Sequence, residues 1–152
     1  MKNLKSLWCL SSTLMVLLLI TAACGGNKEN AEITKLKEET IAVHDEIMPQ
    51  ISLFDRQTVR IDSFLVSMDS LKATNDALDT AQLRVDLTQV KNRLGEATDQ
   101  MMQWMKEFDV NPQDKSEEEI KSYYQSELEK IKKMKNLFDE VSKESAEKLS
   151  DL

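Results

Sequence analysis

The sequence predicts an all-α fold, an antiparallel three-helix bundle of long helices with coiled-coil-like seams. Only three residues are glycine and two are proline, while 31% are charged, a composition typical of long helices. Apolar residues recur every three or four positions over most of residues 31–152, which is the spacing of one helix face. Short connections favour antiparallel neighbours, and an intermolecular coiled coil is the competing arrangement.

The bundle is preceded by a segment that we expect to be removed. Lys2 and Lys5 give a positive start, an apolar run from Leu7 to Ile20 follows, and small residues then lead to a cysteine. These are the parts of a secretory signal peptide. The apolar run is shorter than the roughly 20 residues of a spanning helix. Residues 1–23 are therefore predicted to be a cleaved signal peptide, with a retained membrane anchor or an ordinary Ala-x-Ala cleavage as alternatives.

The four residues Thr21-Ala22-Ala23-Cys24 resemble the lipobox of bacterial lipoproteins. The resemblance implies that Cys24 becomes the N-terminal residue and carries a diacylglyceryl thioether, usually with an acyl chain such as palmitate on its amine. Several chains make such an anchor permanent, since each buried methylene contributes about 0.8 kcal/mol. Gly25 rather than Asp follows Cys24, as in lipoproteins of the outer membrane. The resemblance therefore implies a protein that is lipid-anchored in the outer membrane, on the periplasmic face or on the cell surface. Cys9 falls in the leader, so the mature body has no cysteine for a disulfide.

The first helix is predicted from about Ala31 to Leu71, after a flexible, lipidated tether at residues 24–30. Residues 31–152 form the predicted helical domain. Pro49 interrupts the helical pattern, and a proline inside a helix removes one hydrogen bond and clashes with the preceding turn. Because the periodicity continues in phase on both sides, we expect a kinked helix, with a break near Met48 as the alternative.

The second helix is predicted from about Asp76 to Phe108, after a turn and cap at residues 73–76. Its apolar positions alternate by three and four. Gly95 lies near its centre and weakens it by roughly 1 kcal/mol relative to alanine. We expect this glycine to let a neighbouring helix approach closely.

The third helix is predicted to follow a stop at Asn111-Pro112 and to run to about Lys148. Ser116 and Glu119 form a capping box, in which the hydroxyl and the carboxylate each satisfy a free backbone N–H. In an up-down-up arrangement the first and third helices run parallel. The C-terminus therefore lies far from the tether.

The charge of the chain opposes nucleic acid as a partner. The formal net charge is −7, and loss of Lys2 and Lys5 with the leader makes it −9, whereas phosphate binding needs a basic face. The one basic cluster contains four lysines flanked by acidic residues, so a solvated, salt-bridged face is predicted there. These lysines are Lys130, Lys132, Lys133 and Lys135.

The residues that usually carry catalysis are scarce. The chain has one histidine, and no cysteine remains after the leader and lipid site are accounted for. Acidic pairs such as Glu38-Glu39 are not tied to a nucleophile, a glycine-rich phosphate loop or a zinc pattern. We therefore expect a protein without enzyme activity.

The histidine, His44, lies four residues before Met48 and shares a helix face with it. Imidazole and thioether together suit copper, above all Cu(I), and further methionines follow at Met101, Met102 and Met105. Antiparallel packing is expected to place the middle of the first helix opposite the middle of the second, away from these methionines. The competing interpretation is that methionine fills gaps beside the kink and His44 packs with a carboxylate. On that interpretation the protein has no cofactor besides its covalent lipid.

The densest apolar patch lies near the end of the second helix. Tryptophan and methionine are favoured in the cores of protein interfaces, so the patch is a candidate partner site. Closure of the end of the hydrophobic core is the competing interpretation. The patch consists of Met101, Met102, Trp104, Met105 and Phe108.

Two segments carry a further resemblance. His44 to Pro49 reads His-Asp-Glu-x-Met-Pro, and Met101 to Phe108 contains Met-x-x-Trp-Met-x-x-Phe. In these segments the chain resembles small helical lipoproteins of the Bacteroidota, some of which carry the label "viral A-type inclusion protein". The resemblance implies no defined activity. Two functions are consistent with the sequence: a membrane-anchored envelope lipoprotein with a structural role or a protein partner, and a copper-binding lipoprotein using His44 and methionines.

Overall fold

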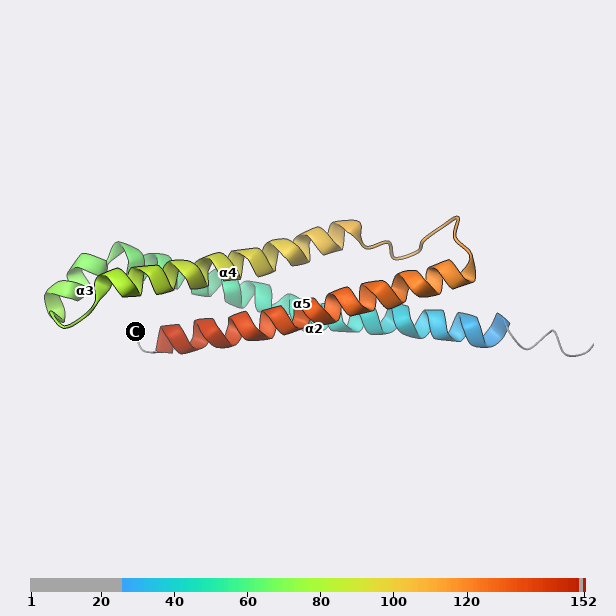
Figure 1. Cartoon of the computed structure of the whole chain (residues 1–152), viewed down its shortest axis with the longest axis horizontal. Coiled ribbons are helices and arrows are strands. Elements are labelled where there is room, and N and C mark those ends of the chain that lie inside the picture. Colours follow the sequence, from blue (N-terminus) through green and yellow to red (C-terminus); the bar gives the residue numbers. More distant parts are fainter. Residues whose placement is uncertain (1–25, 151) are drawn as a thin grey trace, which may run out of the picture.

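The structure, a computed structural model, describes residues 26–150 and residue 152. Within them it is all-helical, which confirms the predicted fold class. The elements are α2 (Gly26–Val66), α3 (Met68–Thr74), α4 (Thr80–Glu107) and α5 (Glu117–Ser150), shown in Figure 1. The first predicted helix is thus divided into α2 and α3. The predicted signal peptide and Cys24 lie outside the described residues.

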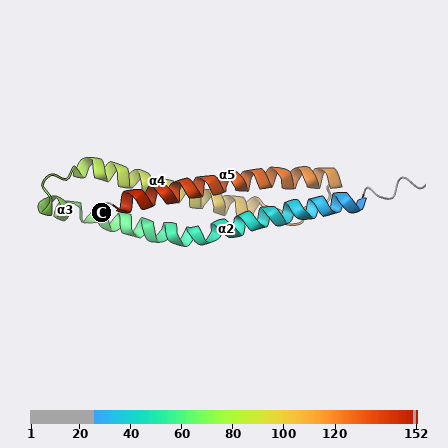
Figure 2. The ribbon, with the colours of Figure 1, turned by 90° about the horizontal axis from the view of Figure 1, so that it is seen from below.

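The three long helices lie side by side, with α2 and α5 running in the same direction and α4 running the opposite way (Figures 1 and 2). Ion pairs join Glu32 to Lys121 and Glu39 to Lys132, each at 2.6 Å. Near the other end, the guanidinium of Arg60 donates to the carbonyl oxygen of Leu149 at 3.0 Å. Later residues of α2 therefore contact later residues of α5, as in a parallel pair. Two parallel helices need a long connection, and α4 provides it.

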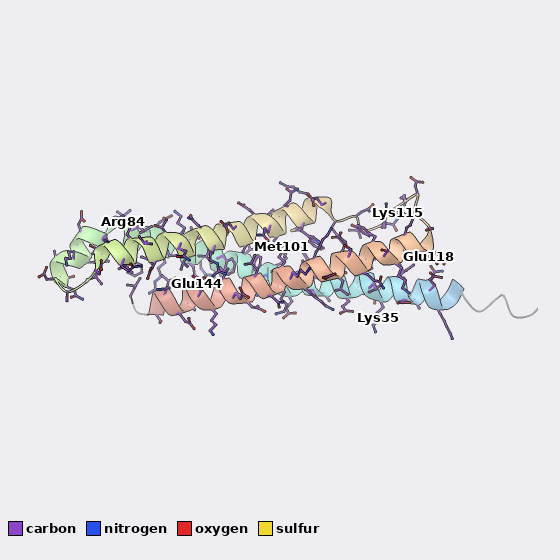
Figure 3. All side chains as sticks on the ribbon, in the orientation of Figure 1. Lys35, Arg84, Met101, Lys115, Glu118 and Glu144 are labelled. Carbon is purple, nitrogen blue, oxygen red and sulfur yellow. The ribbon has the colours of Figure 1, made fainter. Side chains whose placement is uncertain are left out.

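The core fills the space between these helices. On α2 and α3 the fully buried positions recur every seven residues, as in a coiled coil. Phe54 of α2 stacks on Phe138 of α5, with ring centroids 4.9 Å apart. Figure 3 shows Met101 between α4 and the helices beneath it, whereas Lys35 and Glu118 lie on the outside. The heptad positions are Thr40, Ile47, Phe54, Ile61 and Met68.

The start of α2 differs from the prediction. The helix begins at Gly26, so most of the segment 24–30 that was predicted as a flexible tether is helical. Glu29 places a negative charge in the first turn, where it interacts favourably with the helix dipole and stabilises the helix. Asn30 donates to Glu117 of α5 at 3.4 Å, and the nearby Glu32–Lys121 pair joins the same two helices. These contacts with α5 explain why the helix extends beyond the apolar periodicity.

Proline does not break α2, as predicted: the helix runs continuously through Pro49, and Figure 2 shows it bending in its central part. The interruption comes instead at Ser67. The Ser67 hydroxyl donates to the carbonyl oxygens of Ser63 and Phe64, at 2.9 and 3.3 Å. A serine that bonds to its own helix backbone in this way often bends the helix.

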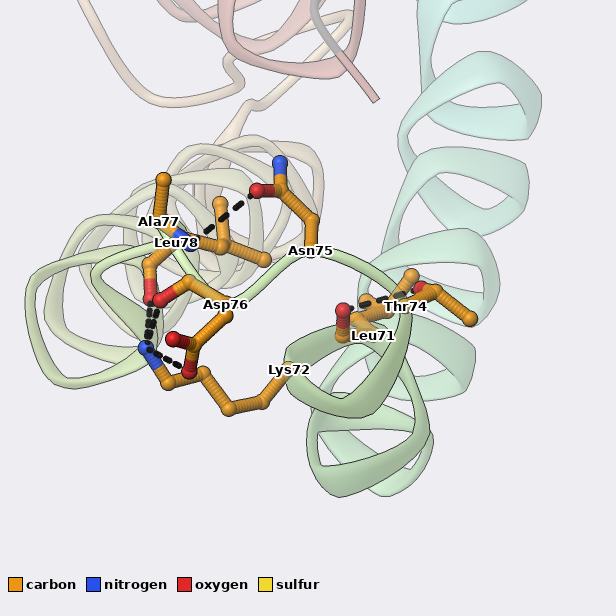
Figure 4. A network of polar contacts seen from close by, with 7 residues as sticks. All are labelled: Leu71, Lys72, Thr74, Asn75, Asp76, Ala77 and Leu78. Carbon is orange, nitrogen blue, oxygen red and sulfur yellow. Dashed lines mark hydrogen bonds and ion pairs between the residues drawn. The ribbon is translucent and has the colours of Figure 1, made fainter.

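A polar turn links α3 to α4 at residues 75–79, a little later than predicted (Figure 4). The ammonium of Lys72 donates to the carbonyl oxygens of Asp76 and Leu78, and the Asn75 side chain accepts from the Ala77 N–H. Asp79 then caps α4 by accepting from the N–H of Gln82 at 3.0 Å. The cap at Asp79 explains why α4 starts at Thr80 rather than Asp76.

The predicted capping box of α5 is confirmed. The backbone N–H of Ser116 donates to Glu119 at 2.8 Å, and the N–H of Glu119 donates to the Ser116 hydroxyl at 3.3 Å.

The expected role of Gly95 is wrong. A methyl group built at Gly95 would meet nothing within 4 Å, because this residue lies on the exposed side of α4.

Candidate binding pocket between α2 and α4

A pocket of about 280 Å³ opens where α2, the end of α4 and the following loop meet. Its lining is mainly apolar, with one imidazole and one carboxylate at the edge. The pocket lies where the two segments that carry the sequence resemblance converge, although they are far apart along the chain. It is lined by Ile41, His44, Asp45, Trp104, Met105, Phe108 and Val110.

The expectation that antiparallel packing separates His44 from the later methionines is wrong. The imidazole of His44 lies against the indole of Trp104, with ring centroids 5.7 Å apart, and Met105 lines the same pocket. The reason is register. The turn at residues 75–79 makes α2 and α4 a hairpin, and the part of α2 before Pro49 lies as far from that turn as the end of α4 does.

His44 is held at the edge of the pocket by its neighbour. Its Nδ1 lies 2.9 Å from a carboxylate oxygen of Asp45, and its side chain is 20% exposed. The prediction that His44 packs with a carboxylate partner is therefore confirmed. An ionised carboxylate only accepts hydrogen bonds, so in the neutral imidazole this contact favours the tautomer with the proton on Nδ1 and the lone pair on Nε2.

The indole of Trp104 is fixed from the side that faces α5. Its Nε1–H donates to the carboxylate of Glu127 at 2.8 Å, and Glu127 is only 6% exposed. Lys130 reaches the second carboxylate oxygen at 2.7 Å, and this hydrogen bond raises the pKa of the Lys130 ammonium. The buried carboxylate thus has a partner on each oxygen, as a charge in such a place requires.

Aromatic contacts extend from Trp104 to the start of α5. The Trp104 indole stacks on Phe108 at 4.7 Å, and Phe108 contacts Tyr123 and Tyr124. The Tyr123 hydroxyl accepts from the N–H of Asp109, and the Tyr124 hydroxyl donates to the carbonyl oxygen of Val110. Burial raises the pKa of both phenols. The loop wall of the pocket is therefore pinned to α5, which makes the pocket preformed.

The structure divides the predicted apolar patch in two. Met101 is fully buried and Trp104 is 7% exposed, so for these two residues closure of the core is confirmed and the exposed partner site is not. Met102 and Met105 are 43% and 40% exposed, and Phe108 is half-buried. The exposed apolar surface at this end of α4 therefore consists of Met102, Met105 and the loop residue Val110.

The predicted metal residues His44 and Met48 are both half-buried on α2, and Met48 packs against the hydrophobic core. Within residues 26–150 and 152, no group of three or more histidine, cysteine, aspartate or glutamate side chains could hold a metal ion. Methionine is not one of these four residue types.

Sequence reasoning missed Glu127 and the two tyrosine hydroxyls. Glu127 lies one turn after Tyr124 on the core face of α5, beside Leu128. A glutamate on a core face is a signal that it has a buried partner, because an unpaired buried carboxylate is very costly. In the structure that partner is the indole N–H of Trp104.

The chain matches no protein-family model, no curated protein and no solved structure. The resemblances noted in the sequence therefore stay predictions. Across the residues that the structure describes, no helix is both long enough and apolar enough to cross a membrane.

Proposed function

We propose that the protein is a lipid-anchored lipoprotein of the outer membrane that binds another envelope protein. On this proposal residues 1–23 are removed, Cys24 carries the lipid and the helices act as a binding rod rather than as a catalyst. The observation that carries the binding role is the apolar pocket, which is lined in part by exposed Met105 and Val110, with exposed Met102 one turn before Met105 on α4. Rigid apolar surfaces of this kind are the usual cores of protein interfaces.

The start of α2 supports the anchoring role. The helix begins two residues after Cys24, so a lipid there would attach almost directly to the end of a rod. A helix of 41 residues is about 60 Å long, and His44 lies roughly 27 Å along it from Gly26.

The arrangement of the helices as a bundle within one chain is part of the same proposal. We take the helices to form one antiparallel three-helix bundle, with α3 completing the first member, rather than part of an intermolecular coiled coil. The shared core of α2, α4 and α5 supports this arrangement. Light scattering on the detergent-solubilised protein should give the mass of one chain, whereas a dimer mass would favour the coiled coil.

The lipid anchor can be tested by metabolic labelling with palmitate. We expect the wild-type chain to be labelled and to sediment with membranes, and Cys24→Ser to lose the label. Cys9→Ser is the matched control, because Cys9 falls in the predicted leader, and it should be labelled normally. Equal labelling of Cys24→Ser and the wild type would contradict the proposal.

The partner surface can be tested in the intact envelope by crosslinking and pull-down. We expect a discrete partner to be recovered with the wild-type protein and to be lost with Met102→Glu/Val110→Glu, which places charge beside the pocket. Val66→Glu is the control, since Val66 is 88% exposed at the other end of α2. Recovery that is unaffected by Met102→Glu/Val110→Glu would remove the pocket from the interface.

A further inference from the structure

Soft metal ligands gather at the seam between α2 and α4. His44 and Met48 are one turn apart on α2, and Met105 and Met101 are one turn apart on α4. His44 and Met105 line the same pocket, and Met48 packs against the core that contains Met101. The pocket therefore brings one imidazole and one thioether together, and a further thioether lies one turn away on each of the two helices.

An ion pair elsewhere on the seam shows which sides of the helices face each other. Asp62 of α2 bonds to Lys91 of α4 at 2.5 Å. Met48 lies two heptads before Asp62, and Met105 lies two heptads after Lys91. Residues that differ by whole heptads share a side of a packed helix, so Met48 and Met105 lie on facing sides of α2 and α4.

The imidazole is prepared for ligation. The Nδ1 contact with Asp45 directs the free lone pair of the ring to Nε2, which is how a carboxylate prepares a metal-binding histidine. Methionine is unbranched and adaptable, so the partly exposed Met105 side chain can close over a bound ion. One imidazole nitrogen with two thioether sulfurs is a donor set that selects Cu(I) among the common metal ions.

We propose that His44 Nε2 and the sulfurs of Met48 and Met105 bind one Cu(I) ion at this seam. Trp104 contacts His44 and lines the pocket, so its indole lies close to the ion and reports on it. The site does not depend on the lipid or on a protein partner. Metal binding and envelope anchoring can therefore succeed or fail separately.

The test uses the full chain in detergent micelles with Cys9→Ser and Cys24→Ser, so that no thiolate competes for copper. Adding Trp8→Phe makes Trp104 the single tryptophan. Cu(I), kept reduced by ascorbate, is titrated in competition with a colorimetric chelator. We expect one Cu(I) per chain and a change in Trp104 fluorescence that saturates at one equivalent, with no displacement by Zn²⁺.

The ligands are tested by matched substitutions. We expect His44→Asn, Met48→Leu and Met105→Leu each to weaken Cu(I) binding by about tenfold or more, and Met102→Leu to leave it unchanged. The asparagine keeps a donor for Asp45 but lacks Nε2, and leucine keeps the volume of methionine. Circular dichroism confirms that each variant is folded.

A second readout locates the ion directly. With Ag⁺ as a stable substitute for Cu(I), the methyl NMR signals of Met48 and Met105 should shift, and that of Met102 should not. The proposal is overturned if the chelator retains all the copper, if binding survives His44→Asn, or if Met102→Leu weakens binding as much as Met105→Leu.

Discussion

At the scale of single residues, Glu127 determines how Trp104 sits. The indole N–H donates to one oxygen of a carboxylate that is almost fully buried, and Lys130 reaches the other oxygen from the surface. Burial strengthens the consequence of losing either partner, because an unsatisfied polar group away from water keeps its full desolvation cost. Trp104 lines the pocket, and its position therefore depends on Glu127, which does not line the pocket.

Glu127→Ala should lower the free energy of unfolding by about 1–3 kcal/mol, because it leaves the buried indole N–H of Trp104 without an acceptor. Urea denaturation followed by circular dichroism measures the change. In a double-mutant cycle, Glu127→Ala should cost less in a Trp104→Phe background, where no N–H needs a partner. Equal costs in both backgrounds would show that the hydrogen bond contributes nothing.

Local chemistry was readable from the sequence where a single motif encodes it. The capping box of Ser116 and Glu119 is an example, since both residues lie within one turn. The contact between His44 and Trp104 was not predicted, because it depends on the position of the turn that fixes the register of α2 and α4. Glu127 was missed because helical periodicity treats any charged residue as facing solvent.

At the scale of helices, the heptad pattern persists where the backbone changes. Met68 continues the series of buried positions from Ile61 even though Ser67 ends α2 between them. Apolar periodicity therefore predicted the buried face of the first helix and missed its end, because the interruption at Ser67 leaves the spacing of the buried positions unchanged. The early start at Gly26 was missed for a similar reason, since it is supported by polar contacts with α5.

Gly95→Ala should raise the free energy of unfolding by about 1 kcal/mol, because the glycine weakens the interior of α4 and the added methyl group meets open space. Thermal melting measures the effect. Ala97→Gly is the reverse control on the same helix, and it should destabilise more, because Ala97 is fully buried. A lower melting temperature for Gly95→Ala would mean that another surface approaches α4 at this point.

At the scale of the whole molecule, charge sets how the helices align. Glu32, Glu39 and Glu46 recur every seven residues on α2 and pair with lysines of α5. Each pair is partly exposed and contributes little free energy by itself. As a series, however, the pairs favour one parallel register of α2 and α5 over its neighbours, as interhelical pairs do in coiled coils.

Acid should destabilise the protein through the carboxylates of α2 and α4 that pair with lysines of α5. Hydrogen bonds from Lys132 and Lys148 lower the pKa of Glu39 and Asp86. The unfolded chain lacks these bonds and takes up protons near the usual carboxyl values of about 4. The resulting stability is complete above those values and is lost as the pH falls through the lowered folded ones.

Melting temperatures measured from pH 7 to pH 3 should therefore fall on the acid side. Lys132→Met/Lys148→Met removes both donors and keeps the length of the side chains, so it should reduce the melting temperature at pH 7 and flatten the decline. A decline of unchanged steepness in that variant would place the acid sensitivity in other groups.

The parallel pairing of α2 and α5 also determines how the chain can fold. Contacts such as Glu39 with Lys132 and Arg60 with Leu149 close loops that contain α3 and α4. Closing a long loop costs chain entropy, and proteins rich in distant contacts fold slowly compared with those built from local ones. The α2–α4 hairpin is the more local unit, and it can form first. Helix α5 is synthesised after α2 and α4 and completes the core, and until it arrives Phe54 has no ring to stack against.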